Sequence, residues 1–290
     1  MELKHKVVKG VAWSTVEKVC SALLQMAVSL VLLNLLTPED YGIMAIVAAF
    51  PAILMPLVDS GFSQALIRKQ NPDDTDYSSV FYLNIAIAVA LYAVLTALTP
   101  LISDYFNVPE FRSIAPVLYL LIPINSFSNI QNALFSRRIE FKQLSLYTLI
   151  ANILSSGVAI VMALYGMGVW ALVGQRLMVV VAKTALLWKG STWRPKRVFS
   201  FDRIKAMFRY GSRILLSDLI SNIYYQISSL FIGKMYSKAD LGYYDRGNKI
   251  KELPVTSTIM AVLNVTFPAF ARLQNDKPKL NDSARKVFLI

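Results

Sequence analysis

Long apolar stretches dominate this sequence and leave few choices for its fold. Eight of them are long enough to cross a bilayer, because a membrane-spanning helix needs roughly 17–25 mostly apolar residues. They cover about residues 11–36, 41–59, 79–101, 113–135, 145–165, 168–188, 211–235 and 252–271, and a ninth begins at Val287. The sequence therefore predicts an all-α integral membrane protein, built as a polytopic helix bundle.

The composition favours a membrane protein over a soluble one. The 290 residues are 55% hydrophobic and 17% charged, whereas a soluble domain is about a quarter charged. A net charge of +12 would suggest nucleic-acid binding in a soluble protein. Here the basic residues cluster in short loops between apolar stretches, where they orient a membrane protein. Nucleic acid is therefore not an expected partner.

The chain has one cysteine, Cys20, and one histidine, His5. A single cysteine rules out an internal disulfide and a cysteine-based metal site. His5 lies in the charged N-terminal segment, where we expect it to be solvated. We therefore expect no metal and no cofactor. The first apolar run extends to Leu36, which is too long for the apolar part of a signal peptide, so we expect a retained span.

Lysine and arginine are distributed unevenly between alternate loops, and this predicts the orientation of the spans. With the N-terminus in the cytoplasm, 20 basic residues lie in cytoplasmic segments and 6 lie outside. By the positive-inside rule this bias is strong enough to fix the orientation. The most basic segment is KGSTWRPKRVFSFDRIKAMFR at residues 189–209, with a single acid. Residues 234–251 are the exception, because their five basic residues are expected outside.

Features of the N-terminal part recur about 200 residues later. The turn TPEDYG at residues 37–42 corresponds to SKADLG at residues 237–242, and Gly10 corresponds to Gly211. Six spans separate the two copies, so both begin on the same side of the membrane. The repeat is therefore parallel, a plan that recurs in transporters built from two halves.

The repeat predicts two lobes joined by the cationic segment. We assign residues 1–190 to a complete first lobe of six helices and residues 191–209 to a cationic cytoplasmic linker. Residues 210–290 are the start of a second lobe that we expect to be truncated, because the chain ends at VFLI as a new apolar run begins.

Polar side chains recur on one face of four spans. These stripes are Ser14, Lys18, Ser21, Gln25 and Ser29; Asn125, Asn129 and Asn132; Thr148, Asn152 and Ser155; and Asp218, Ser221, Tyr225 and Ser229. A polar face in hydrocarbon must meet another polar face or water. We therefore predict a bundle around a central hydrated cavity. For any single Ser or Asn, hydrogen bonding between helices is the alternative.

Ionisable residues inside the spans are the strongest candidates for substrate binding. Arg176 lies near the middle of the sixth span, where its side chain cannot easily reach the interface. Lys183 and Lys18 have the alternative of extending to the membrane surface, and Asp218 that of pairing with Lys18 or Arg213. A cationic interior suits a phosphate or pyrophosphate group. The predicted cavity residues are Arg176, Lys183, Lys18, Arg213, Asp218, Gln25, Asn125, Asn129 and Asn152.

Five segments carry a resemblance to a known family: KGVAWSTVEKV, LTPEDYGIMAIV, DSGFSQALIRKQ, FSRRIEFKQLS and FPAFARLQNDKPKL. Along its whole length the chain resembles the Wzx-type flippases of polysaccharide biosynthesis and export, in the branch of colanic-acid and lipopolysaccharide exporters. That family belongs to the MOP superfamily, which includes multidrug exporters of the MATE type. Members have more spans than this chain, so the resemblance implies that most of the second half is missing.

The resemblance implies a MATE-like two-lobe transporter that works by alternating access. Its substrate would be an undecaprenyl-pyrophosphate-linked oligosaccharide, such as an O-antigen or colanic-acid repeat unit, moved across the bacterial inner membrane. The implied partners are the lipid bilayer and the polysaccharide polymerase and chain-length regulator proteins of the same pathway.

Two other functions are less consistent with the sequence. A MATE-type multidrug or cation antiporter would need acidic cavity residues, and only Glu17, Asp59 and Asp218 lie near the spans. A membrane enzyme of the same pathway would need a sizeable outside loop with acids, Arg or His, and the predicted outside loops are short. We therefore expect a transporter and not an enzyme.

Overall fold

The computed structural model describes residues 2–59 and 61–251, and this part of the chain is helical without strands. Its helices are α1 (Glu2–Leu35), α2 (Pro38–Asp59), α3 (Phe62–Arg68), α4 (Asp74–Phe106), α5 (Phe111–Tyr119), α6 (Leu121–Arg137), α7 (Phe141–Leu164), α8 (Val169–Gly190) and α9 (Phe201–Met235). Residues 238–251 form a further helical segment. The prediction of an all-α protein is confirmed.

Six stretches of the described chain are long and apolar enough to cross a membrane, and they coincide with the first six predicted spans. They are Ala12–Leu35, Pro38–Arg68, Asp74–Phe106, Phe111–Arg137, Phe141–Leu164 and Val169–Gly190. The seventh predicted span lies within α9, which is long enough but too polar to be counted among the six. The eighth and ninth predicted spans lie outside the described residues.

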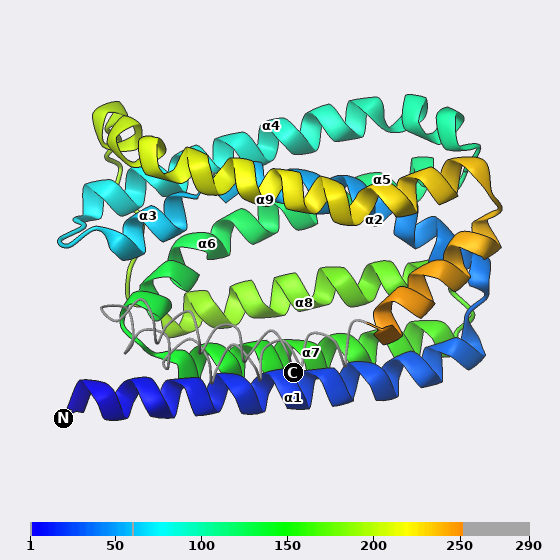
Figure 1. Ribbon diagram of the computed structural model, residues 1–290, viewed down its shortest axis with the longest axis horizontal. Coiled ribbons are helices and arrows are strands. Elements are labelled where there is room, and N and C mark those ends of the chain that lie inside the picture. Colours follow the sequence, from blue (N-terminus) through cyan, green and yellow to red (C-terminus); the bar gives the residue numbers. More distant parts are fainter. Residues whose placement is uncertain (1, 60, 252–290) are drawn as a thin grey trace, which may run out of the picture. The chain divides into compact units, whose positions relative to one another are not determined.

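Residues up to Tyr244 form one compact unit, in which the helices make two groups. α7 packs between α1 and α8, and Figure 1 shows these three running side by side. α9 crosses the group formed by α2, α3 and α4, and contacts all three. α6 contacts both α4 and α8 and so joins the two groups.

Within the expected cationic linker at residues 191–209, residues 191–200 lack helical structure and α9 begins at Phe201. Ile204 and Met207 are buried on one side of the first turns of α9. Residues three apart share a helix face, so this apolar face packs against the core and extends the helix toward the N-terminus.

The linker is anchored to the beginning of α4. The backbone N–H of Lys196 donates to Ser78 Oγ at 3.0 Å, and that of Ser200 donates to Ser79 Oγ at 2.9 Å. Trp193 is buried with its ring centroid 5.9 Å from that of Phe81. Buried aromatic contacts of this kind add to the stability of a core, so the linker is part of the packed structure.

The two turns that the sequence matched have the same hydrogen bonds. In the first, Asp40 Oδ2 accepts from the N–H and the hydroxyl of Thr37, both at 3.0 Å, and the Asp40 N–H donates to Thr37 Oγ1 at 3.3 Å. In the second, Asp240 and Ser237 form the same three bonds at 3.2, 2.6 and 3.1 Å. The predicted equivalence of these turns is confirmed.

The same two turns cross each other at Gly42 and Gly242. A Cβ on Gly42 would lie 1.9 Å from the carbonyl oxygen of Lys238, and one on Gly242 would lie 1.9 Å from that of Pro38. Each glycine therefore faces the equivalent carbonyl of the other copy. Reciprocal contacts of this kind arise between two copies related by a two-fold axis.

Candidate functional site

The nine predicted cavity residues lie on five helices and differ in burial. Asn152 on α7 is buried, and Asn125 and Asn129 on α6 and Lys183 on α8 are half-buried. The other five are exposed on the described structure: Arg176, Lys18, Gln25, Arg213 and Asp218. The nine candidates therefore do not share one environment, and Asn152 is the most buried among them.

A polar contact joins α1 to α7 near the middle of both helices. The Ser21 hydroxyl donates to Glu17 Oε1 at 2.9 Å and accepts from Asn152 Nδ2 at 2.9 Å. Lys183 of α8 lies within electrostatic reach of the same Glu17 carboxylate. At this point two of the predicted polar stripes meet and join α1 to α7, which is the alternative of helix–helix hydrogen bonding.

Several other predicted cavity residues take no part in that hydrogen-bonded contact. Lys18 and Gln25 lie on the exposed side of α1. Arg176 and Lys183 are seven residues apart on α8, close to two helical turns, and so share one face. The Glu17 carboxylate of α1 lies close to Lys183.

Asp218 is placed differently from what the sequence suggested. Among the described residues it makes no ion pair with Lys18 or Arg213; instead it lies within electrostatic reach of Asp59 at the end of α2. Asn84 of α4 lies against the same Asp59 carboxylate. Sequence analysis noted Asp59 only as an acid near a span and missed Asn84, because a single amide in an apolar span makes no periodic pattern.

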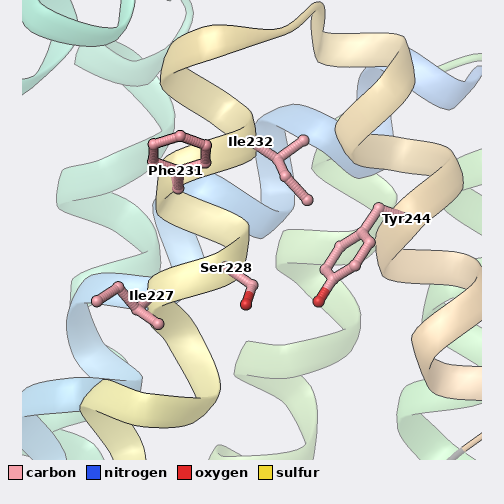
Figure 2. A pocket seen from close by; sticks show the side chains of 5 residues that line it. All are labelled: Ile227, Ser228, Phe231, Ile232 and Tyr244. Carbon is pink, nitrogen blue, oxygen red and sulfur yellow. The ribbon is translucent and has the colours of Figure 1, made fainter.

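A shallow pocket in the described structure lies away from all nine candidates. It lies between α9 and the helical segment that follows, and is lined by Ile227, Ser228, Phe231, Ile232 and Tyr244. Figure 2 shows the hydroxyls of Ser228 and Tyr244 facing each other across a lining that is otherwise apolar. This pocket offers no charged side chain to an anionic substrate.

Acids at the beginning of α4 neutralise cations of the linker and of α9. The side chain of Asp76 is fully buried and pairs with Lys69 at 2.6 Å and with Arg203 at 3.3 Å. Lys196 pairs with Asp74 at 2.6 Å and Arg203 with Asp73 at 3.3 Å. The N–H of Asp76, aided by its side chain and by Arg203, lowers the pKa of the Asp73 carboxyl. The linker charge is thus partly neutralised within the protein.

Arg137 at the end of α6 binds the end of α3. Its guanidinium donates to the backbone carbonyls of Leu66, Ile67, Lys69 and Gln70. The last carbonyls of a helix lack partners within the helix, and a planar fork of five donors can reach several of them at once. Arg137 therefore has a structural role, and it does not contribute to the candidate cavity.

Comparison with known proteins identifies the family. The model of a family described as polysaccharide biosynthesis protein matches residues 31–290. The succinoglycan biosynthesis transport protein ExoT of Rhizobium meliloti (strain 1021) is 26% identical over 94% of this chain and 55% of its own length. The lipopolysaccharide biosynthesis protein WzxC of Escherichia coli (strain K12) is 20% identical over 100% of this chain and 59% of its own. The chain therefore spans little more than half of these relatives.

A solved structure has the same fold. A multidrug resistance MATE family transporter of the MOP superfamily, in an inward-facing conformation, matches with a TM-score of 0.63 over 94% of this chain and 66% of its own, at 18% identity. The expectation of a MATE-like transporter fold is confirmed by this likeness.

Proposed function

Because the chain belongs to the polysaccharide biosynthesis protein family, we propose that it is part of a flippase for lipid-linked oligosaccharides. It is a multi-pass membrane protein with the fold of MOP-superfamily transporters. The proposed substrate is an undecaprenyl-pyrophosphate-linked repeat unit of O-antigen, colanic acid or a similar polysaccharide. The family match carries this proposal, and the names of the relatives, which refer to succinoglycan transport and lipopolysaccharide biosynthesis, support it.

The cations among the candidate residues suit the anionic part of such a substrate. A pyrophosphate group is recognised by guanidinium and ammonium donors, and Arg176 and Lys183 share one face of α8. In the proposal these two bind the pyrophosphate, with Lys18 and Arg213 adding positive charge. The amides of Gln25, Asn125 and Asn129 are the matching donors and acceptors for sugar hydroxyls.

We propose alternating access between a first lobe at residues 1–190 and a second lobe that begins at residue 210. The equivalent turns at residues 37–42 and 237–242, with their reciprocal glycine contact, support two related lobes. The protein would lie in the bacterial inner membrane with its N-terminus and linker in the cytoplasm. Polymerase and chain-length regulator proteins are proposed as partners.

Complementation tests the function. The complete reading frame is expressed in a strain that lacks its own exporter, and surface polysaccharide and accumulated lipid-linked repeat units are measured. We expect polysaccharide to return and the intermediate to clear. Persistence of the intermediate together with a gain in drug resistance would instead support the MATE-type antiporter.

Variants of Arg176 test the proposed site in the same assay. Arg176→Ala should abolish export without lowering the amount of protein in the membrane, and Arg176→Lys should retain part of it because one positive charge remains. Arg138→Ala, which removes an exposed arginine outside the proposed site, is the matched control. Normal export by Arg176→Ala would remove Arg176 from the site.

Cysteine labelling tests the orientation. In a Cys20→Ser background, Thr192→Cys places a label site on the exposed linker, and Tyr165→Cys places one on the exposed turn after α7. A reagent that does not cross the inner membrane should label Tyr165→Cys but not Thr192→Cys in intact cells. The opposite result would invert the proposed topology.

A further inference from the structure

The linker and the first turns of α9 carry several cations without an acidic partner. Among the basic residues at 189–209, Lys196 and Arg203 pair with the acids at the beginning of α4. Arg194 donates to three backbone carbonyls at the end of α8 and in the linker. Lys189 lies in the last turn of α8, where the helix dipole favours a cation. The remaining cations of this segment are exposed and form no ion pair within the described residues: Arg197, Lys205 and Arg209.

Two exposed phenylalanines lie beside these cations in the chain. Phe199 is 55% exposed and Phe201 is 69% exposed. Phe201, Lys205 and Arg209 follow one another in steps of four residues and so share one face of α9, whereas α9 buries a different face against the core. A face that combines aromatic rings with lysine and arginine is typical of a segment in the headgroup region of a membrane.

Hydrogen bonds to α4 hold this part of the linker in place. The backbone N–H groups of Lys196 and Ser200 donate to Ser78 Oγ and Ser79 Oγ. These two bonds lie on either side of residues 197–199, which are exposed. Because the linker is already fixed at both points, a ligand that binds it orders little additional backbone.

The same two bonds place the linker at the end of a membrane-spanning helix. α4 has 33 residues, so it is about 50 Å long, whereas the hydrocarbon core of a bilayer is about 30 Å thick. A helix of this length centred in the core extends about 10 Å beyond it at each end. That distance includes Ser78 and Ser79 in the first two turns of α4. The linker bound to them therefore lies at the depth of the lipid headgroups.

We propose that this linker surface binds anionic phospholipid headgroups through its three cations, while its two aromatic rings insert into the same leaflet. The linker surface consists of Arg197, Phe199, Phe201, Lys205 and Arg209. Guanidinium and ammonium groups donate charge-assisted hydrogen bonds to phosphate oxygens. The one acid of the segment, Asp202 in the first turn of α9, leaves the surface with a net positive charge. The proposal concerns lipids of the bilayer and does not depend on which substrate the protein carries.

Thermal unfolding of the purified full-length protein in a non-ionic detergent tests the proposal. One titration adds the anionic lipid phosphatidylglycerol, and the other adds phosphatidylcholine, which has no net charge. A ligand that binds only the folded protein raises the Tm, and we expect phosphatidylglycerol to raise it by about 3 °C more than phosphatidylcholine. In about 0.5 M NaCl this difference should fall by about half, because salt screens exposed charges. Equal responses to the two lipids at low salt would overturn the proposal.

Substitution of the cations locates the site. Arg197→Gln, Lys205→Gln and Arg209→Gln should each weaken the apparent affinity for phosphatidylglycerol by about fivefold, and the triple variant should respond to both lipids alike. Arg138→Gln is the matched control, because Arg138 is an exposed arginine outside the linker surface, and it should keep the full response. A full response in the triple variant, or as large a loss in the control as in Arg197→Gln, would contradict the proposal.

Removal of the two rings tests their insertion. The double variant Phe199→Ser and Phe201→Ser should bind both lipids about tenfold more weakly, because less apolar surface leaves water. It should keep its preference for phosphatidylglycerol, since the three cations remain. Unchanged affinity for both lipids would show that the rings do not insert.

Arg176→Ala distinguishes this proposal from the flippase proposal. It should keep the full response to phosphatidylglycerol, even though export is expected to be lost. Loss of the lipid response in this variant would place the lipid at the proposed substrate site and overturn a separate linker surface. Mass spectrometry of the phospholipid that remains bound after purification gives a second measurement, in which the wild type should retain more phosphatidylglycerol than the triple variant. Equal retention would contradict the proposal.

Discussion

α9 contacts the preceding helices at both ends, and the two ends use different physical interactions. Near its C-terminal end, the turn that follows it crosses the turn before α2, and Gly42 and Gly242 each face a carbonyl oxygen. Near its N-terminal end, Arg203 pairs with the acids at the beginning of α4. The first contact depends on the absence of side chains, whereas the second depends on charged side chains.

The difference predicts how each end responds to substitution. The backbone contact at the two glycines leaves no room for even one methyl group. Moving the close-packed turns apart to make room would lower the free energy of unfolding. Ion pairs between exposed groups contribute about 0–1 kcal/mol, so the N-terminal contact depends mainly on Asp76, the fully buried acid. One end should therefore be sensitive at its two glycines, Gly42 and Gly242, and the other mainly at Asp76.

Gly42→Ala should have the largest effect. The new Cβ would overlap the Lys238 carbonyl, and relieving such an overlap should lower the free energy of unfolding by about 3 kcal/mol. Gly157→Ala is the control, because nothing lies within 4 Å of a Cβ there, so it should be neutral or slightly stabilising. Intrinsic tryptophan fluorescence during thermal unfolding measures both.

The reciprocal contact makes a second, sharper prediction at the same crossing. If Gly42→Ala already separates the two turns, a second substitution, Gly242→Ala, should lower the free energy of unfolding only a little further. The reason is that the two glycines share one contact. Fully additive losses would show that the two glycines act independently and would contradict a shared crossing.

Asp76→Asn should have the next largest effect, about 2 kcal/mol, because it breaks charged hydrogen bonds to Lys69 and Arg203 at a fully buried carboxylate. Asp74→Asn is the matched control, since Asp74 and its partner Lys196 are both exposed, and it should change stability by less than about 1 kcal/mol. Equal losses in the two variants would show that burial of Asp76 is unimportant.

Arg137→Lys should cost about 1 kcal/mol, because an ammonium cannot reach the four carbonyls that the guanidinium binds. Proteolysis in detergent should also cut the loop after α3 faster in this variant. Arg138→Lys, at the exposed neighbouring position, is the control and should leave the cleavage rate unchanged.

The smallest effect should come from Glu110, which pairs with Lys238 at 3.1 Å near the glycine crossing. Its own backbone N–H, together with Lys238, lowers the pKa of its carboxyl from 4.5. A lowered pKa in the folded state adds stability that is complete above about pH 4.5 and is lost as the pH falls through the folded value. Wild type should therefore exceed Glu110→Gln slightly in Tm at neutral pH, and the difference should vanish in acid.

Local patterns in the sequence predicted several features correctly. The first six spans follow from apolar length alone, and the equivalence of the turns at residues 37–42 and 237–242 follows from an Asp three residues after Thr or Ser. Both are short-range properties. Asn84 and its neighbour Asp59 were not predicted as a pair, because 25 residues of sequence separate them and only the packing of α4 against α2 brings them together.

The polar stripes show where prediction from the sequence ends. Spacing placed Ser21 and Asn152 each on one face of a helix, but it did not determine which faces meet. The same pattern is compatible with a wet cavity or with a hydrogen bond between helices, and the structure shows the hydrogen bond for this pair. For Lys18 and Gln25, which remain exposed, the cavity stays a prediction.

By itself the sequence determined that the chain is helical and crosses a membrane, because backbone groups in hydrocarbon must form their hydrogen bonds within the helix. It also determined that the turns at residues 37–42 and 237–242 are related, because their similarity is local in the sequence. Only the tertiary structure decided how α9 contacts the preceding helices, which acids pair with cations of the linker, and that Asn84 lies next to Asp59. These outcomes depend on side chains that are far apart in the chain, and helix periodicity carries no information about which helices become neighbours.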